Sequence, residues 1–169
     1  CCIVELGLQS KMLIYVAIAG LLGMMGAIVW YASLDNPELE QVQITLKNVE
    51  VLDVNNIENF AKLEVTFLVK NPSEKTFTVP IIAYKLYADD KLLGSSQYST
   101  EDISMSGRAV FYGGAEIPLK NSFILKKSEV DSQLYQAILS HKISGFSAEG
   151  SITTETSWSL IEKEFKTSI

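Results

Sequence analysis

The side chains that could do chemistry are few and scattered along the sequence. The single histidine, His141, is the first candidate for a metal ligand or a general base. A metal site needs several ligands at defined spacings, and no cluster of histidine, cysteine or carboxylate surrounds His141. We therefore interpret His141 as a residue at the end of a helix, where the helix dipole favours a cation.

Other candidate motifs lack the residues that their chemistry requires. Asp89 and Asp90 are adjacent acids without the further oxygen ligands of a calcium loop, so we interpret them as solvated turn residues. Gly107 and the pair Gly113–Gly114 have no lysine at the spacing of a phosphate-binding loop. No Gly-x-Ser-x-Gly motif is present for a serine nucleophile. The sequence predicts no enzyme, no cofactor and no metal site.

The charge pattern argues against a nucleic-acid partner. The chain has 14 basic and 20 acidic residues, and no basic stripe stands out. No run of like charge indicates a disordered tail. The only cysteines are Cys1 and Cys2, which no complete lipidation motif surrounds, so neither a disulfide framework nor a thiolate metal site is predicted after them.

A long apolar segment is the first element that organises the chain. Residues 12–32 include no charged residue, and as a helix they span roughly 31 Å, enough to cross a hydrocarbon core. Trp30 and Tyr31 at the end of this segment favour a membrane interface. A cleaved signal peptide is the alternative, but the apolar run is too long and its best exit site lacks a small residue. We predict a transmembrane helix at 12–32, after a short tail at 1–11.

Lys11 before the helix and acidic residues after it indicate an orientation. The positive-inside rule places the N-terminus in the cytoplasm and the C-terminal domain outside the cell membrane. The tail at 1–11 is open to three interpretations: native, processed, or upstream of a start at Met12. Small residues gather on one face of the helix: Ala19, Gly20, Gly23, Gly26 and Ala27. Such a face lets a second helix approach closely, so we expect membrane lipid and other membrane proteins as partners, in a homo- or hetero-oligomer.

After a linker at 33–41, the sequence has the period of β-strands with one buried face. Apolar and polar residues alternate most clearly from Leu63 to Val69, and a change of phase near Asn48 predicts a β-bulge. A second alternating run starts at Phe77. Shorter strands are predicted at 103–105, 109–112 and 116–119, another run at 146–154, and an edge strand at the C-terminus.

One segment, at 126–142, has a helical period instead. Val130, Leu134 and Ile138 fall on one apolar stripe, with Ser128 as the predicted N-terminal cap and Gly145 as the stop. About seven short strands with one late helix predict a mainly β fold. We expect an immunoglobulin-like (fibronectin III-like) β-sandwich at 42–169, preceded by a single transmembrane α-helix.

Several motifs in the sandwich resemble those of one family. They are Asn71-Pro72-Ser73 after an alternating strand, Tyr84-Lys85-Leu86-Tyr87, Leu92-Leu93-Gly94, and Ala148-Glu149-Gly150 after the helix. Over residues 46–156 the chain resembles the late embryogenesis abundant group 2 (LEA2) family, also called the water stress and hypersensitive response (WHy) domain. The resemblance implies a small β-sandwich without a cofactor, often behind a membrane helix in archaeal and plant members, and an association with stress tolerance.

The turn at Asn71 could be structural or bind a ligand. We interpret it as structural, because an Asn side chain can satisfy backbone groups that Pro72 leaves unpaired. We thus expect a non-catalytic membrane protein whose extracytoplasmic sandwich acts by binding or protection. Two alternatives stay open. One is an accessory subunit of a larger complex, such as an archaeal membrane monooxygenase or oxidase. The other is a pilin-like filament subunit, with Glu5 before the packed helix, although Lys11 would be costly there.

Overall fold

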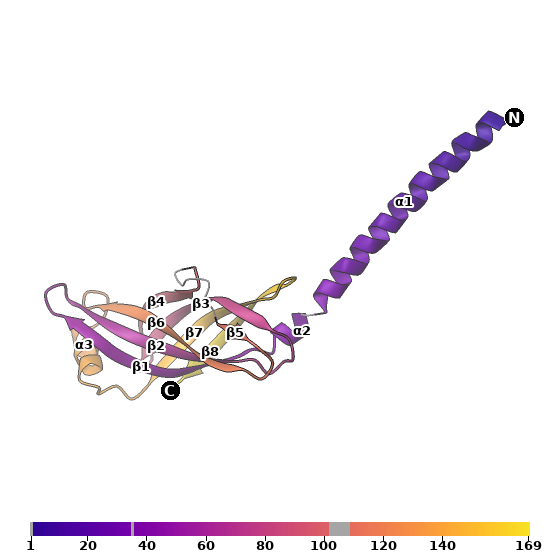
Figure 1. Cartoon of the computed structure of the whole chain (residues 1–169). Helices are drawn as coiled ribbons and strands as arrows, with labels where there is room; N and C mark the ends of the chain where they lie inside the picture. Colours follow the sequence, from indigo (N-terminus) through magenta and orange to yellow (C-terminus); the bar gives the residue numbers. More distant parts are fainter. Residues whose placement is uncertain (1, 35, 102–108) are drawn as a thin grey trace. The chain divides into compact units, whose positions relative to one another are not determined.

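The computed structural model of the chain describes residues 2–34, 36–101 and 109–169. The chain divides into two compact units, Cys1–Asn36 and Pro37–Ile169 (Figure 1). The first unit is helical and the second is mainly β-structure. The predicted strand at 103–105, together with Gly107 and Cys1, lies outside the described residues, as do the side chains of Cys2 and Glu5.

The first unit is built from α1 (Cys2–Ser33). By length and composition, the stretch Lys11–Leu39 is long and apolar enough to cross a membrane, with a mean hydropathy of 2.3. None of its most apolar window is buried; Leu13 is 71% exposed and Val16 68% exposed. Along the chain, an apolar helix therefore precedes the β-structure.

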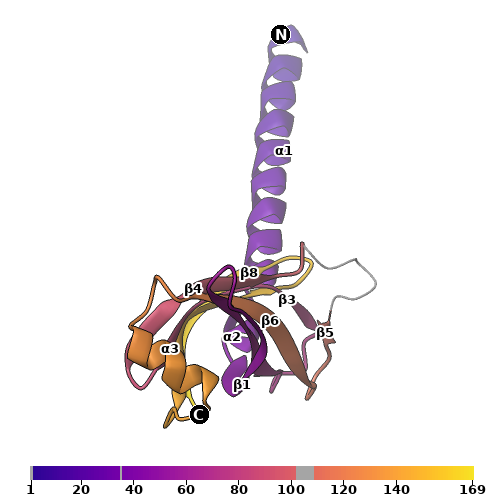
Figure 2. The same cartoon turned by 90° about the vertical axis from the view of Figure 1, so that its left-hand side faces the viewer.

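The second unit contains two antiparallel sheets, which the views in Figures 1 and 2 show as two layers. A short helix, α2 (Asn36–Leu39), leads into the first strand. The three-stranded sheet has the order β1-β2-β6, formed by β1 (Gln43–Asn55), β2 (Phe60–Lys70) and β6 (Glu116–Lys126). The five-stranded sheet has the order β4-β3-β7-β8, formed by β4 (Lys91–Ser99), β3 (Phe77–Ala88), β7 (Phe146–Glu155) and β8 (Leu160–Ser168). A short strand, β5 (Val110–Phe111), pairs with the start of β3.

The core lies between the two sheets, as the alternating pattern predicts. In β2 every second side chain is fully buried: Ala61, Leu63, Val65, Phe67 and Val69. The ring of Phe67 packs edge-on against Tyr84 at 4.8 Å and against Phe165 at 5.8 Å, which joins the two layers. The predicted fold class, a mainly β sandwich with one late helix, is confirmed.

Side chains of β8 hydrogen-bond to the backbone of β1 and of the residues just before it. We call this contact between the two sheets the seam. The backbone N–H of Leu46 donates to the Thr167 hydroxyl at 3.0 Å. The ammonium group of Lys163 donates to the carbonyls of Glu40 at 2.7 Å and Val42 at 2.8 Å. These bonds satisfy edge groups of β1 that would otherwise be open to pairing with another chain.

Several boundaries differ from the predictions. The strand predicted at 116–119 continues to Lys126. The late helix, α3 (Ser132–Leu139), is shorter than the predicted segment. Its N-terminal cap is Asp131, whose carboxylate accepts from the N–H of Gln133 at 3.3 Å, so the prediction of Ser128 is wrong.

The helix also ends before the predicted stop. Gly145 lies six residues beyond Leu139, in the connection to β7, where a Cβ would meet the carbonyl oxygen of Ile169 at 2.7 Å. Gly145 is therefore needed for a close approach of two chain segments and not to stop α3.

Candidate functional site

The turn after β2 is organised around Asn71, whose side chain is completely buried. Its amide group donates to three backbone carbonyls: those of Lys75 at 2.7 Å, Phe111 at 3.0 Å and Tyr112 at 3.1 Å. Its amide oxygen accepts from the N–H of Ser73 at 3.0 Å and from the Ser73 hydroxyl at 2.8 Å. The side chain therefore ties the end of β2 to the turn itself and to the segment after β5.

Two neighbours complete this turn. Pro72 follows Asn71 and removes one backbone donor, and β2 ends at Lys70. A Cβ on Gly113 would lie 3.0 Å from the carbonyl oxygen of Ser73, so the two segments approach too closely for a larger residue. The contacts of Asn71 are all with this chain, which is the geometry of a structural turn.

The other motif residues, Tyr84, Gly94 and Gly150, lie in strands β3, β4 and β7 of the five-stranded sheet. The Asn121 amide donates to the Tyr84 hydroxyl at 2.9 Å and to Ser96 at 3.2 Å, and burial raises the pKa of Tyr84. A Cβ on Gly150 would lie 2.0 Å from the carbonyl oxygen of Ala83, where no side chain fits. Gly94 has a φ of 149°, and a Cβ added there would lie 3.2 Å from the ring of Phe123. These residues hold strands together and present no reactive group.

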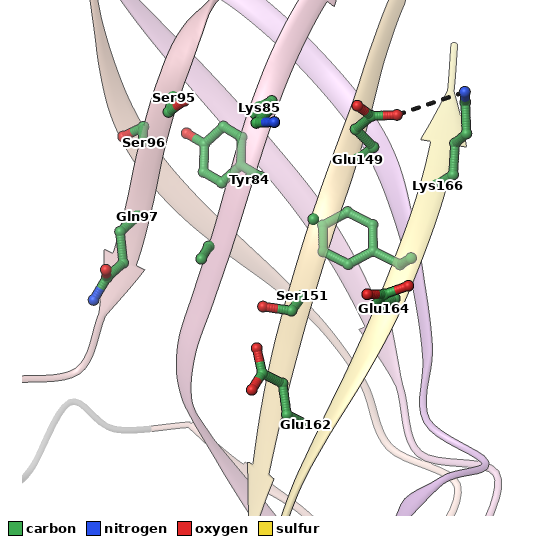
Figure 3. A pocket seen from close by; sticks show the side chains of 13 residues that line it. Tyr84, Lys85, Ser95, Ser96, Gln97, Glu149, Ser151, Glu162, Glu164 and Lys166 are labelled. Carbon is green, nitrogen blue, oxygen red and sulfur yellow. Dashed lines mark ion pairs between the residues drawn. The ribbon is translucent and has the colours of Figure 1, made fainter.

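A broad, shallow polar surface lies on the outer face of the five-stranded sheet (Figure 3). We call it the open face, and it encloses about 990 Å³. Its charged and polar side chains are Lys85, Ser95, Gln97, Glu149, Ser151, Glu162, Glu164 and Lys166. They come from four adjacent strands, at outward positions of the alternating pattern. Hydroxyl, amide, carboxylate and ammonium groups together suit a polar partner that is held by many weak hydrogen bonds.

The charges on the open face partly neutralise each other. Glu149 accepts a hydrogen bond from the Tyr87 hydroxyl and lies 3.6 Å from the Lys166 ammonium (Figure 3). The hydrogen bond from Tyr87, followed by the attraction of Lys166, lowers the pKa of Glu149 below its ordinary value. The same hydrogen bond raises the pKa of Tyr87.

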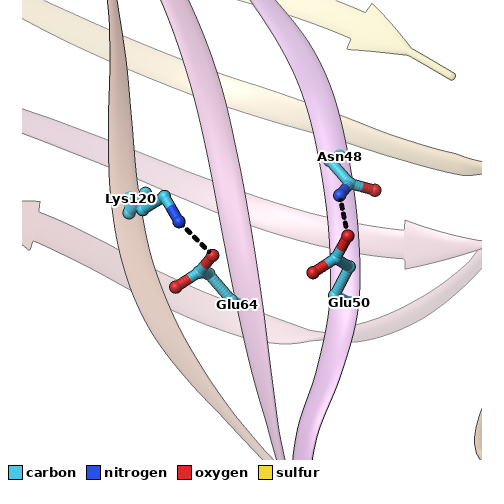
Figure 4. A network of polar contacts seen from close by, with 4 residues as sticks. All are labelled: Asn48, Glu50, Glu64 and Lys120. Carbon is cyan, nitrogen blue, oxygen red and sulfur yellow. Dashed lines mark hydrogen bonds and ion pairs between the residues drawn. The ribbon is translucent and has the colours of Figure 1, made fainter.

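A smaller polar cluster lies on the outer face of the other sheet (Figure 4). The Lys120 ammonium donates to Glu64 at 2.7 Å, and this bond raises the pKa of Lys120. The amide of Asn48 donates to the carboxylate of Glu50. The first pair connects β6 with β2 at the surface, and the second lies within β1.

His141 and Asp89 have roles that the sequence did not predict. His141 has a φ of 53°, one residue beyond the cap Ser140. Its N–H donates to the carbonyl of Ile138 at 3.1 Å, and the N–H of Lys142 donates to that of Ala137 at 2.9 Å. This is a Schellman motif, so His141 ends α3 through its backbone conformation and not through its charge.

The pair Asp89 and Asp90 forms the turn between β3 and β4, with φ values of 47° and 63°. Asp90 is exposed, as expected of a turn residue. The carboxylate of Asp89, however, accepts from the N–H groups of Ser144 at 3.1 Å and Gly145 at 3.3 Å. Asp89 is thus an exposed turn residue, as expected, and it also binds the segment before β7.

The site residues predicted on the apolar helix are exposed on α1. Trp30 and Tyr31 are both 71% exposed. A Cβ placed on Gly20, Gly23 or Gly26 would have nothing within 4 Å. The small-residue face, which also includes Ala19 and Ala27, is thus open to a partner helix. Among the residues that the structure describes, no group of three or more His, Cys, Asp or Glu side chains could hold a metal ion.

The sequence reasoning missed the open face. A signal was present, since Lys85, Glu149 and Lys166 occupy the polar phase of their strands. Alternation shows that such residues point outward, but it does not show which strands are neighbours. Only the strand order brings β3, β7 and β8 together and makes one surface of them.

Comparisons with known proteins support the fold alone. No protein-family model matches the chain, and no curated protein matches it. The solution structure of a protein from Arabidopsis thaliana is 12% identical, with a TM-score of 0.52, covering 75% of this chain and 79% of that one. A protein from Archaeoglobus fulgidus is 12% identical, with a TM-score of 0.45, covering 74% of this chain and 94% of that one.

A further solved structure is that of a candidate late embryogenesis abundant (LEA) protein. It is 10% identical to this chain, with a TM-score of 0.44, and the match covers 89% of this chain and 84% of that one. At such identities a likeness concerns the fold only. Of the three structures, the Arabidopsis protein has a TM-score above 0.5, and it supports the sandwich architecture of residues 37–169.

Proposed function

We propose that this chain is a single-pass membrane protein in which α1 anchors an LEA2-like β-sandwich outside the cytoplasm. One observation carries the proposal. The large apolar side chains of α1 from Met12 to Val29 are each more than half exposed. The buried apolar residues, by contrast, form one cluster that begins at Leu39. An apolar helix that no core covers needs another apolar environment, and a bilayer supplies it.

The sandwich, in this proposal, acts by binding through the open face and not by catalysis. The face offers many hydrogen-bonding groups, and its best-connected carboxylate, Glu149, is held ionised. The arrangement of Asn71, Tyr84 and Gly150 supports the relation to the LEA2 family, including archaeal members. A role in stress tolerance follows from that relation, and survival after drying or salt challenge tests it in cells that lack the gene. Unchanged survival counts against the role.

Membrane attachment and orientation can be tested on the full chain in cells. After an alkaline carbonate wash, the chain is expected in the membrane pellet, and its release into the wash would overturn the anchor. For orientation, the native Cys1 and Cys2 are first replaced by serine, and Ile57→Cys then places the only thiol at a side chain that is 92% exposed. A membrane-impermeant maleimide should label it on intact cells, whereas Ala148→Cys, at a fully buried position, should stay unlabelled until the protein is denatured. Labelling of Ile57→Cys only after cell lysis would reverse the orientation.

A second candidate function is that of an accessory subunit in a membrane complex. The open space around Gly23 on α1 favours it, because a neighbouring helix can approach closely there. Extraction in a mild detergent followed by a native gel tests it. Gly23→Ile should release the chain from the complex and the matched variant Leu22→Ile should not. Migration of the unmodified chain only as a monomer would exclude this function.

A further inference from the structure

Large apolar side chains are exposed in two turns of the sandwich. Trp158, in the turn between β7 and β8, is 71% exposed, and Leu160 at the start of β8 is 64% exposed. Tyr112, directly after β5, is 66% exposed. These side chains are not needed to fill the core, so their exposure calls for another partner.

The position of Trp158 follows from the seam between β8 and β1. Two hydrogen bonds, Lys163 to Val42 and Leu46 to Thr167, join residues that are both 121 positions apart in the sequence. The two strands therefore run side by side in the same direction. Followed back along both strands, this alignment places the start of β8 at the same end of the sandwich as the start of β1.

The turn with Trp158 thus lies at the end of the sandwich where the chain enters it, which we call the entry end. Figure 1 shows the yellow turn between β7 and β8 at the same end as the start of β1, far from α3. Tyr112 lies at this end too. The Tyr112 carbonyl accepts a hydrogen bond from the Asn71 side chain. Asn71 directly follows Lys70, which pairs with Gln43, the first residue of β1.

We propose that Trp158, Leu160 and Tyr112 enter the lipid interface of the membrane that α1 crosses. The inference rests on the proposed function, because it requires α1 to span the bilayer. Only three residues separate the last residue of α1, Ser33, from Pro37. The four steps from Ser33 to Pro37 reach at most about 14 Å when extended, which keeps the entry end close to the membrane surface. Tryptophan and tyrosine side chains favour that interface, since they combine an apolar ring with a polar group.

The charges of the entry end indicate which lipids this contact favours. The exposed charges there have an excess of acid, with Glu40, Glu74, Glu116 and Glu155 against Lys70 and Lys75. Carboxylates are repelled by an anionic membrane surface, so the contact depends on insertion of apolar side chains and not on charge attraction. Vesicles or discs of uncharged phosphatidylcholine are therefore the suitable probe.

The test uses the fact that the chain has two tryptophans, Trp30 and Trp158. In the full chain with Trp30→Phe, placed in phosphatidylcholine nanodiscs, Trp158 is the only indole. Lipids with bromine near the head of the acyl chain should quench its emission, and its spectrum should lie at shorter wavelength than in water. The matched control carries Trp30→Phe, Trp158→Phe and Ile57→Trp, which moves the indole to the exposed turn at the opposite end. Its emission should be unaffected by bromine.

A third variant, Trp158→Phe alone, leaves Trp30 to report on α1. If bromine quenches Trp30 but affects Trp158 no more than the Ile57→Trp indole, the lipid contact is overturned while the anchor stands. If Trp30 is not quenched either, the proposed anchor fails. If Trp158 is shielded from a water-soluble quencher in native membranes but escapes bromine in the discs, a protein covers it, and the lipid contact is again overturned.

Discussion

The Asn71 turn and the open face are built from similar polar groups but differ in their access to water. Asn71 is fully buried and both ends of its amide are bonded. On the open face, the side chains of Glu149 and Lys166 remain 38% and 79% exposed. A buried polar group that loses its partner costs about 1–3 kcal/mol, whereas an exposed ion pair contributes little. We therefore expect the turn to contribute more to stability than the open face.

The largest effect is expected from Asn71→Ala. The change removes the bonds from the Asn71 amide to three backbone carbonyls and the bond that its oxygen accepts from the Ser73 N–H. The carbonyl of Tyr112 keeps the N–H of Ala115 and that of Lys75 keeps the Ser73 hydroxyl, so the cost falls mainly on the buried bonds to Phe111 and Ser73. We predict a loss of about 3 kcal/mol in the free energy of unfolding. Urea unfolding of the full chain in a mild detergent, followed by near-ultraviolet circular dichroism, measures it. The control Asn56→Ala, at an exposed position in the β1–β2 turn, should leave the transition unchanged.

A charge at the same place sharpens the comparison. Asn71→Asp keeps the shape and the acceptor oxygen but aims a carboxylate at the carbonyls of Phe111 and Tyr112. This variant should be no more stable than Asn71→Ala. Wild-type stability in both variants would mean that the turn does not support the fold.

Gly150→Ala should have the next largest effect. A Cβ at this position would lie 2.0 Å from the carbonyl oxygen of Ala83 and 2.7 Å from the Cα of Tyr84, so β7 must move away from β3. We predict a loss of about 2 kcal/mol, within the range for overpacked sites. Gly20→Ala is the matched control, because the added Cβ meets nothing within 4 Å on α1. Equal unfolding midpoints for the two variants would contradict the close approach of β7 and β3.

Lys163→Met tests the seam beside β1, where polar groups are partly buried. The variant keeps the length of the side chain but loses both hydrogen bonds to the carbonyls of Glu40 and Val42. We predict a loss of about 1 kcal/mol and faster amide exchange at the start of β1. The control is Lys166→Met on the same strand, whose exposed ammonium group faces the open face. If the control destabilises as much as Lys163→Met, general charge and not the seam is responsible.

The strands were predictable where one face is buried. Alternation from Leu63 to Val69 predicted β2, and the change of phase at Asn48 predicted the bulge that appears as a register shift after Leu46. The helix ends were less predictable, because several residues competed to cap them. Asp131 accepts from the N–H of Gln133 and therefore starts α3, which the more distant Ser128 does not.

The candidate sites show the same limit. The Asn71-Pro72-Ser73 turn could be found in the sequence, because its residue types act on their own backbone. The open face could not, since Lys85 and Glu149 are 64 positions apart in the sequence and meet only through the pairing of β3 with β7. The alternation within one strand does not indicate which distant strand pairs with it.

The smallest effect on stability is expected from Glu149→Gln on the open face, where its consequence should be local. The hydrogen bond to the Glu149 carboxylate raises the pKa of Tyr87, so removing the negative charge should lower that pKa toward its ordinary value. Spectroscopic titration of the tyrosines measures this shift, with Glu164→Gln as a control that leaves it unchanged.

The folded-state pKa of Glu149 is lowered, so the stability that this group contributes is present above the ordinary glutamate pKa and is lost as the pH falls through the lowered value. Glu149→Gln should remove that acidic part of the pH dependence while leaving the unfolding midpoint at neutral pH nearly unchanged. A large loss at neutral pH would mean that the open face supports the fold as the Asn71 turn does, and the distinction between the two regions would fail.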